Sequence, residues 1–438
     1  MNQPNTRPGE RAGLKVLRRL TVVLALTAVA SAASTGLAQQ AAPKRDPASR
    51  AAVVLTWDQA QREAGFASME SIFLTRTVRA AVTPRPLPGG RALAAYAPGG
   101  ARAAEFDQFV KDQKVSGLLV LHDGTLRLER YALTGGLKTR WHSFSVAKSI
   151  TSTLVGAAMK DGHIKSLDDP VTRYIAGLRG SAYDDVTVKQ LLTMTSGVRW
   201  NEDYTDLNSD VARMYATPPD PGYDMTVSYV RKLPRDAPPG TKWVYKTSET
   251  NLVGVLVAEA TRKPLADYLS EKVWRPYGME RDAEWMIDDV GHEQGGCCLA
   301  MTLRDLGRFG QFILEGARIG GMPIVPDTWL AEATRNQIQA TGNGAGYGYQ
   351  WWPRDDGTFE GRGIYGQTLH IDPKRRLVIV INSAAEAPTG RDIGRSRQAF
   401  IAAVKAEIDA EKIRTTTAAR RARSAAVAVP SGAGMSVR

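Results

Sequence analysis

Two runs of apolar residues flank an Asp-Gly pair where regular patterning of the chain begins. The first run starts at Val115 and ends at Leu121, directly before His122, and the second run covers residues 126–132. An Asp-Gly pair between apolar runs is a strong signal for a tight β-hairpin. The pattern therefore predicts that two antiparallel strands come first.

A helical repeat follows the predicted hairpin. Apolar residues recur at helical spacing between Phe144 and Lys160, and Gly162 stands where a helix would end. The other faces of this segment carry mostly Ser, Thr, Gly and Ala. Such small residues on every face predict a helix that is packed on all sides rather than one on the surface.

The rest of the chain predicts a helical insert and a return to strands. Helix signals lie at 186–195, 252–261 and 264–274, strand signals at 347–352, 367–371 and 377–381, and a last helix signal at 395–412. This order indicates an α+β fold, in which one antiparallel sheet is built from both ends of the chain, is flanked by helices and receives an inserted all-helical lobe.

The two ends of the chain differ from this patterned part. Five basic residues precede an uncharged run that ends in small residues, which is typical of a secretory signal at 1–38, cut after Ala38. An uncleaved anchor is the alternative. Residues 39–104 are expected to form an arm and linker, residues 105–412 the domain, and residues 413–438 a disordered basic tail. The signal places the protein in the periplasm or outside the cell.

Net charge and cysteines exclude little and predict no special site. The formal charge is +12, but residues 1–20 and 415–438 each carry +4, so the body has an ordinary balance and no nucleic-acid partner is expected. Cys297 and Cys298 are the only cysteines. Because adjacent Cα atoms lie closer than most disulfides require, we expect no disulfide, no zinc site and two small buried structural residues.

Candidate chemistry begins with Ser145 and Lys148, which stand at the start of the predicted buried helix. A spacing of three residues puts the hydroxyl and the amine on one face of a helix. A serine becomes a nucleophile when a nearby base removes its proton, and a buried lysine can be neutral and act as that base. A serine and a lysine at this spacing are expected about once by chance in a chain of this composition. The surrounding residues therefore decide whether the pair is an active site.

That context consists of five motifs, in order: Phe144–Lys148, Leu191–Gly197, Pro239–Tyr245, Thr302–Gly310 and Gly363–Gln367. With these motifs the chain resembles the serine β-lactamase, penicillin-binding protein and esterase group over residues 105–412. The 6-aminohexanoate-dimer hydrolase branch is the most similar in appearance. The resemblance implies that Tyr245 helps to move the protons of the nucleophile and the leaving group, and a phenol beside a protonated lysine could be held partly ionised.

Two departures from the family pattern bear on the substrate. Thr247 stands where Tyr-x-Asn has its asparagine, and Ile364-Tyr365-Gly366 replaces Lys-Thr-Gly. The residues expected to hold the side chain and the carboxylate of a β-lactam are thus missing. The pattern favours an esterase or linear-amide hydrolase over a β-lactamase or D-alanyl-D-alanine carboxypeptidase.

The resemblance also names residues that would contact the substrate. Gly366 allows the backbone to approach the substrate closely, and the main-chain N–H groups of Ser145 and Gln367 could form an oxyanion hole. Tyr204 matches a substrate-contacting tyrosine of the nylon-oligomer enzymes. Glu202 and Asp203 beside it are expected to be solvated loop acids, although they could instead attract a substrate amine.

The sequence therefore predicts an exported serine hydrolase that cleaves an ester or linear amide of a small molecule through an acyl-enzyme on Ser145. No metal or organic cofactor is expected, because His142 and His370 look structural and no metal motif occurs. Stable membrane insertion is not expected if the signal is cleaved, and the oligomeric state is open. Two rival classes remain: a non-catalytic penicillin-recognising or cell-wall-binding homologue, and a nucleic-acid or anionic-surface binder driven by the basic tail.

Overall fold

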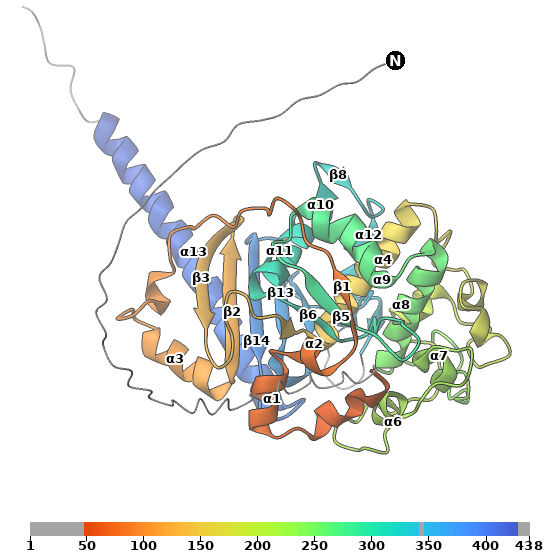
Figure 1. The fold of residues 1–438 in the computed structure, drawn as a ribbon. Coiled ribbons are helices and arrows are strands. Elements are labelled where there is room, and N and C mark those ends of the chain that lie inside the picture. The colour runs from red at the N-terminus through yellow and green to blue at the C-terminus, as the bar shows by residue number, and fades with distance from the viewer. Residues whose placement is uncertain (1–47, 341–345, 428–438) are drawn as a thin grey trace, which may run out of the picture. The chain divides into compact units, whose positions relative to one another are not determined.

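In a computed structural model, which describes residues 48–340 and 346–427, a six-stranded antiparallel sheet forms the centre of the main unit. Its strand order is β11 (Trp352–Pro353), β12 (Phe359–Arg362), β13 (Thr368–Asp372), β14 (Leu377–Ser383), β2 (Val115–His122) and β3 (Thr125–Tyr131). Figure 1 shows β2 and β3 beside β14, so the sheet joins early and late segments of the chain. The predicted α+β class is confirmed.

The predicted hairpin is also confirmed in its turn. Asp123 and Gly124 both have positive φ, +49° and +71°, which is the geometry of a tight hairpin turn. Every residue of β2 except His122 is buried, because both faces of the sheet are covered. Leu118 packs with one hydrophobic cluster and Leu119 with the other, as the twofold alternation of a strand requires.

Helices cover both faces of this sheet. One face packs on α3 (Ala103–Asp112) and α13 (Arg391–Val427), where Phe109 and Phe400 stack at 4.6 Å between ring centres. The other face packs on α11 (Leu303–Leu314) and on the main core, which contains α4 (Ala147–Lys160). The short 3-10 turn η3 (Phe144–Val146) leads into α4, and Gly162 has φ +78° just past its end, as predicted.

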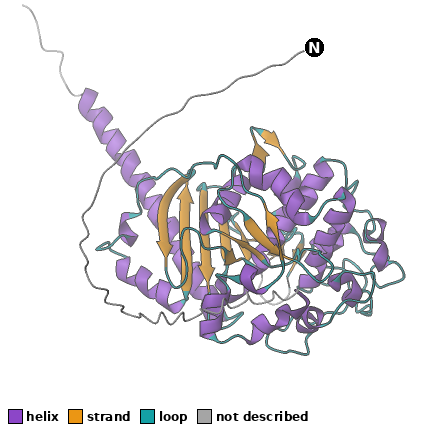
Figure 2. Ribbon diagram, in the orientation of Figure 1, coloured by secondary structure: helices purple, strands orange, loops and turns teal. Residues whose placement is uncertain are grey.

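The middle of the chain forms the helical lobe, which Figure 2 shows as helices and loops without a long strand. Its helical elements are η4 (Val171–Arg173), η5 (Ala176–Leu178), α5 (Val188–Leu192), α6 (Asp210–Ala216), α7 (Met225–Val230), α8 (Thr247–Thr261), α9 (Leu265–Leu269), the π-helical turn η6 (Ser270–Trp274) and α10 (Arg275–Tyr277). Helix α8 begins five residues before the predicted start, and this extension brings Thr247 into the site.

A second sheet was not predicted. It contains four short strands in the order β1 (Thr75–Val78), β5 (Ala283–Met286), β6 (Leu299–Met301) and β4 (Trp141–His142). Strands of two to four residues are too short to show a clear alternation of apolar and polar positions. Two further pairs, β7 (Arg318–Ile319) with β8 (Met322–Pro323) and β9 (Ile338–Gln339) with β10 (Gly346–Tyr347), consist of two-residue strands.

The predicted strand at 347–352 is wrong in its middle. Only its ends pair, in β10 and β11, because Gln350 adopts a left-handed backbone with φ +65° between them. The Gln350 side chain reaches Leu192 O at 2.8 Å and also accepts a hydrogen bond from Thr250 at 2.6 Å. These long-range bonds hold a turn where the local sequence favours extension. The remaining helical elements are α12 (Trp329–Ala333) and the short 3-10 turn η7 (Ile364–Gly366).

The expected arm and linker at 39–104 is corrected for residues 48–104, while residues 39–47 lie outside the described part. This segment folds as η1 (Ala48–Thr56), α1 (Gln59–Gly65), α2 (Met69–Ile72), β1, η2 (Ala94–Tyr96) and the start of α3. Phe66 and Phe73 are fully buried in the main core. Their burial shows that the Ala- and Pro-rich composition hid a segment that packs against the domain.

The expected disordered tail is likewise corrected for residues 413–427, which continue α13, and residues 428–438 lie outside the described part. The helix extends past the predicted end at Lys412, and Ile413 is 67% exposed. Ala and Arg are good helix formers, and lengthening an existing helix is easier than starting one. The extension therefore needs no core contacts.

No helix in the described ranges is long and apolar enough to cross a membrane. The predicted signal at 1–38 lies outside those ranges.

Candidate active site

The predicted pair Ser145 and Lys148 meets at the start of α4. Ser145 lies in η3, directly after Phe144, whose φ of +45° is a left-handed conformation that a bulky residue adopts only under constraint. The Lys148 side chain is 1% exposed, and its Nζ lies 3.0 Å from Ser145 Oγ. The amine is thus close enough to receive the serine proton.

Two further groups hold the Lys148 amine. Its Nζ donates to Gly296 O at 2.5 Å and lies 3.0 Å from Thr247 Oγ1. Among the described residues no carboxylate forms an ion pair with this amine. Burial lowers the pKa of Lys148 to about 7, while the charge of Glu202 acts in the opposite direction. Close to half of the lysine is therefore neutral near pH 7, which is the form that a general base requires.

Tyr245 lies against the same amine, with its ring centre 5.1 Å from Lys148 Nζ. The ring stacks on Trp352 at 5.8 Å, and its hydroxyl makes a hydrogen bond with Ser145. Burial raises the pKa of Tyr245 above its ordinary value, and the bond to Ser145 only partly opposes this. The expectation of a partly ionised phenol is therefore corrected: the buried ring keeps its proton and can donate it.

A buried ion pair that the sequence analysis did not identify directly follows Tyr245 in the chain. Lys246 Nζ is 3.0 Å from Glu249 Oε1, both side chains are at most 1% exposed, and Ser196 also bonds to the carboxylate. Burial raises the pKa of Glu249, and the ammonium of Lys246 opposes that rise. The pair ties the second motif, Tyr245-Lys246-Thr247, to Ser196 of the Leu191–Gly197 motif. The i, i+3 spacing of Lys and Glu was the available signal.

Thr247, which replaces the asparagine of the family pattern, is hydrogen-bonded to Glu202. Its N–H donates to Glu202 Oε2 at 3.0 Å, and its hydroxyl donates to Glu202 Oε1. The Tyr204 hydroxyl also donates to Glu202 Oε1, at 2.7 Å. Glu202 is thus occupied by protein groups, so neither a solvated loop acid nor a free partner for a substrate amine describes it. Asp203 is exposed and bonds to Thr205 instead.

The third motif lies beside the nucleophile. Tyr365 and Gly366 form a tight turn with φ +59° and +95°. A side chain at Gly363 would come within 2.8 Å of Ser143 O, so this backbone lies directly against the residues before Ser145. The Gln367 amide accepts from Trp141 Nε1 at 3.1 Å and from Ser383 N at 3.0 Å, which fixes its main chain. The oxyanion role of the Ser145 and Gln367 N–H groups stays a prediction.

Two hollows meet at Ser145 and Tyr204. The wider one has a volume of about 1260 Å³ and contains Tyr245, Trp352 and Gly366 in its wall. The narrower one has a volume of about 510 Å³, including its open mouth, and is lined mostly by apolar residues. The predicted residues Tyr204 and Gly366 therefore both lie where a substrate could touch them.

The wider hollow contains cations, although the third motif has none. Arg362, Arg391 and Arg397 line it. Arg362 lies 5.1 Å over the Trp352 ring, and its Nε donates to the buried Glu360 at 2.6 Å. The arginines therefore give this side of the site a positive charge, although Ile364 stands in place of the family's lysine.

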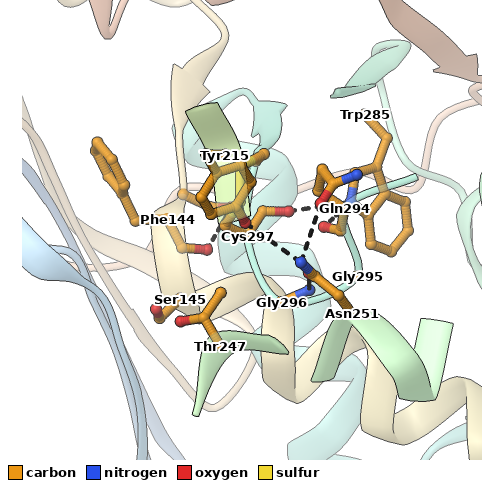
Figure 3. Close-up of a disulfide and its surroundings, with 12 residues drawn as sticks. Phe144, Ser145, Tyr215, Thr247, Asn251, Trp285, Gln294, Gly295, Gly296 and Cys297 are labelled. Carbon is orange, nitrogen blue, oxygen red and sulfur yellow. Dashed lines mark hydrogen bonds between the residues drawn. A yellow bond between two sulfur atoms is a disulfide. The ribbon is translucent and has the colours of Figure 1, made fainter. Parts of the chain in front are cut away.

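The narrower hollow contains a disulfide between Cys297 and Cys298, against the expectation that they would be free (Figure 3). The adjacent Cα atoms are 3.7 Å apart, and Cys298 has φ +74°, so the backbone turns between the two residues and lets neighbours bond. The preceding residue, Gly296, holds Lys148 through its carbonyl and donates to Asn251 Oδ1 at 2.7 Å. The disulfide is therefore part of the site's wall.

The histidines do not form a competing centre. His370 is buried against Glu360 at 3.0 Å, and His142 lies in the wall of the narrower hollow. Within the two described ranges, no three His, Cys, Asp or Glu residues are grouped so that they could hold a metal ion.

Comparison with known proteins identifies the family to which the chain belongs. The β-lactamase family model matches residues 102–404. A 6-aminohexanoate-dimer hydrolase from Paenarthrobacter ureafaciens is 29% identical over 306 residues, which are 66% of this chain and 78% of that protein. A solved structure described as a "putative 6-aminohexanoate-dimer hydrolase" from Bacillus anthracis has a TM-score of 0.70 at 26% identity, covering 80% of this chain and 94% of the other. A class C β-lactamase shares the fold at a TM-score of 0.52 and 16% identity over 66% of this chain and 91% of its own. The family match covers more than half of the sequence, so the chain belongs to the β-lactamase family of serine hydrolases.

Proposed function

We propose that the protein hydrolyses a linear amide or an ester of a small molecule through an acyl-enzyme on Ser145. The observation that carries the proposal is the 3.0 Å contact between Lys148 Nζ and Ser145 Oγ, together with the lowered pKa of Lys148. Lys148 takes the proton as Ser145 Oγ attacks the carbonyl carbon. Tyr245 then gives a proton to the departing amine or alkoxide, and Lys148 returns one to the phenol.

The oxyanion is held by the main-chain N–H groups of Ser145 and Gln367 in this proposal. Donors fixed at the place where negative charge develops contribute strongly to acyl transfer. The anchored side chain of Gln367 supports this role, because its bonds to Trp141 and Ser383 keep the main chain from moving. Water attacks the acyl-enzyme in the second step, with Lys148 again as the base.

The altered motifs favour linear substrates over β-lactams. The Thr247 hydroxyl donates to Glu202 and accepts from Lys148. It therefore cannot bind a substrate amide as an asparagine side chain would. Ile364 places an apolar side chain where the family pattern has a lysine. β-Lactamase or D-alanyl-D-alanine carboxypeptidase action is the alternative, and fast cleavage of a β-lactam would support it.

The test compares three substrates on the purified protein: p-nitrophenyl acetate, a linear 6-aminohexanoate dimer and the chromogenic β-lactam nitrocefin. We expect a burst of p-nitrophenol equal to the enzyme concentration and slow or no turnover of nitrocefin. Ser145→Ala should abolish the burst. Ser149→Ala is the matched control, because Ser149 lies one turn further along α4 and bonds to Gln350 O instead. A burst that survives Ser145→Ala would overturn the proposal.

Two measurements separate the rival classes. In the same assay, a non-catalytic penicillin-recognising protein would show no burst with any ester or amide. In a binding assay with DNA or anionic lipid, a binder of nucleic acid or anionic surfaces would bind through the basic C-terminal residues, and truncation after Ile413 would remove that binding.

We also propose that the protein is exported to the periplasm or beyond. The basic, apolar and small-residue order of residues 1–38 supports export, and a disulfide between Cys297 and Cys298 suits an oxidising compartment. N-terminal sequencing of protein from the periplasmic fraction should begin at Gln39. An intact N-terminus on membrane-bound protein would instead indicate the uncleaved anchor.

A further inference from the structure

The narrower hollow at Ser145 is closed by a part of the chain that precedes the family match. Ala51, Ala52, Val54 and Leu55 of η1 line it, whereas the matched region begins at residue 102. On the other sides lie apolar groups such as Met69 and Met286 and the disulfided cysteines. The space of about 510 Å³ includes the open mouth of the hollow, so only part of it is enclosed. We call this hollow the acyl pocket, for the reason given below.

Among the described residues, none that lines the acyl pocket carries a charge at neutral pH. Burial lowers the pKa of His142 to about 3, so its ring is neutral. The disulfide removes both cysteine thiols, and the Tyr215 hydroxyl, whose pKa is raised by burial, is 3.1 Å from Cys297 Sγ. Figure 3 shows Tyr215 and Cys297 next to Ser145 and Phe144. An ionised group would enter this pocket without a partner.

The placement of Tyr245 assigns the two hollows to the two halves of the substrate. Tyr245 lines the wider hollow and not the acyl pocket, while Ser145 lines both. In the proposed function Tyr245 protonates the leaving group, so the leaving group occupies the wider hollow. The acyl part then lies on the opposite side of Ser145, against η1 and the disulfide.

We propose that the acyl pocket binds the acyl half of the substrate as an uncharged aliphatic chain and disfavours chains that end in an ammonium group. This inference rests on the proposed function and adds the substrate class. A preference for amino-terminated acyl groups is not expected, because the Glu202 carboxylate already accepts hydrogen bonds from Thr247 and Tyr204.

The test uses a pair of esters that differ only in the terminal group, p-nitrophenyl hexanoate and p-nitrophenyl 6-aminohexanoate. We expect kcat/KM to be at least tenfold higher for the hexanoate, and higher for the hexanoate than for the acetate. Ala52→Leu, which fills the pocket, should lower the ratio of hexanoate to acetate hydrolysis. Ala52→Asp, which adds a carboxylate to the wall, should lower the ratio of hexanoate to 6-aminohexanoate hydrolysis.

Val53→Asp is the matched control. Val53 lies next to Ala52 in η1, but it is 48% exposed and does not line the pocket. It should therefore keep the wild-type preference. Equal or faster hydrolysis of the 6-aminohexanoate ester by the wild-type protein would overturn the inference and leave the proposed function intact.

A binding measurement decides the inference even if no ester or amide is turned over. Calorimetric titration of Ser145→Ala protein with hexanamide and with 6-aminohexanamide compares the neutral and the charged chain without chemistry. Hexanamide should bind at least tenfold more tightly, and Ala52→Leu should weaken its binding. Equal affinity for the two amides would overturn the inference, whereas loss of all turnover with retained hexanamide binding would overturn only the proposed function.

Discussion

Burial of Lys148, opposed by the charge of Glu202, should set the pH at which the enzyme becomes active. Lys148 must be neutral to accept the Ser145 proton, and its pKa of about 7 is the balance of burial, which lowers it, and Glu202, which raises it. Glu202→Gln removes the charge but keeps the shape. The amide oxygen can accept from the Thr247 N–H, while the NH₂ group can donate to the Thr247 and Tyr204 hydroxyls once these rotate.

The size of the effect on activity follows from the burial of Lys148. At its ordinary pKa of about 10.5, only about one Lys148 in 3,000 would be neutral at pH 7, whereas a pKa of about 7 leaves about half of it neutral. Burial thus raises the population of the active base by roughly a thousandfold at pH 7. In wild-type protein the rate should fall about tenfold for each pH unit below about 6. Each unit by which Glu202→Gln lowers the pKa should raise the normalised rate on that acid limb about tenfold.

The assay is kcat/KM for a neutral ester between pH 4.5 and 9, because this quantity reports the pKa of the free enzyme. Wild-type activity should rise through an apparent pKa of about 7, and Glu202→Gln should move that rise to lower pH. Asp203→Asn is the matched control, since Asp203 is exposed and its carboxylate accepts hydrogen bonds from the neighbouring Thr205. An acid limb near pH 10 in the wild type, or a limb that Glu202→Gln moves upward, would refute the assignment of Lys148 as the base.

Three further changes test other parts of the site. Tyr245→Phe should lower kcat by about 10²- to 10⁴-fold for a linear amide and far less for a p-nitrophenyl ester, whose leaving group needs no proton; equal losses in steady-state kinetics would contradict its role as the acid. Glu249→Ala strands the buried ammonium of Lys246 and should cost about 3–5 kcal/mol in urea unfolding, and a loss below about 1 kcal/mol would show that the pair is not needed. Gly366→Ala should destabilise the fold by about 1–3 kcal/mol and reduce kcat, since φ is +95° and the new Cβ would lie 2.9 Å from a serine hydroxyl. Gly357→Ala, at φ +81° with open space around it, should have a smaller effect on unfolding and none on kcat.

Local pattern was enough to predict the framework of the site. The Asp-Gly hairpin, the helix α4 that follows Ser145 and the strands near 368–372 and 377–383 are formed by residues close in sequence, so periodicity and turn residues reveal them. The same locality placed Ser145 and Lys148 on one helical face. The order of motifs then identified the family and pointed to Tyr245, Tyr204 and the third motif.

Contacts between distant segments decided what the sequence could not show. Lys148 meets Thr247 and Gly296 from 99 and 148 residues away, and its pKa depends on the burial that these contacts create. The disulfide required a left-handed turn at Cys298, and a spacing rule could not foresee it.

The acyl pocket is the clearest case. Composition marked residues 48–56 as linker, yet η1 closes a pocket at Ser145. The hydrophobic effect is non-directional and acts between segments at any distance along the chain. Whether an alanine-rich segment is a linker or a pocket wall therefore depends on the surface against which it packs. The sequence determined which residues could perform the chemistry; the tertiary structure determined their protonation and the shape of the space around them.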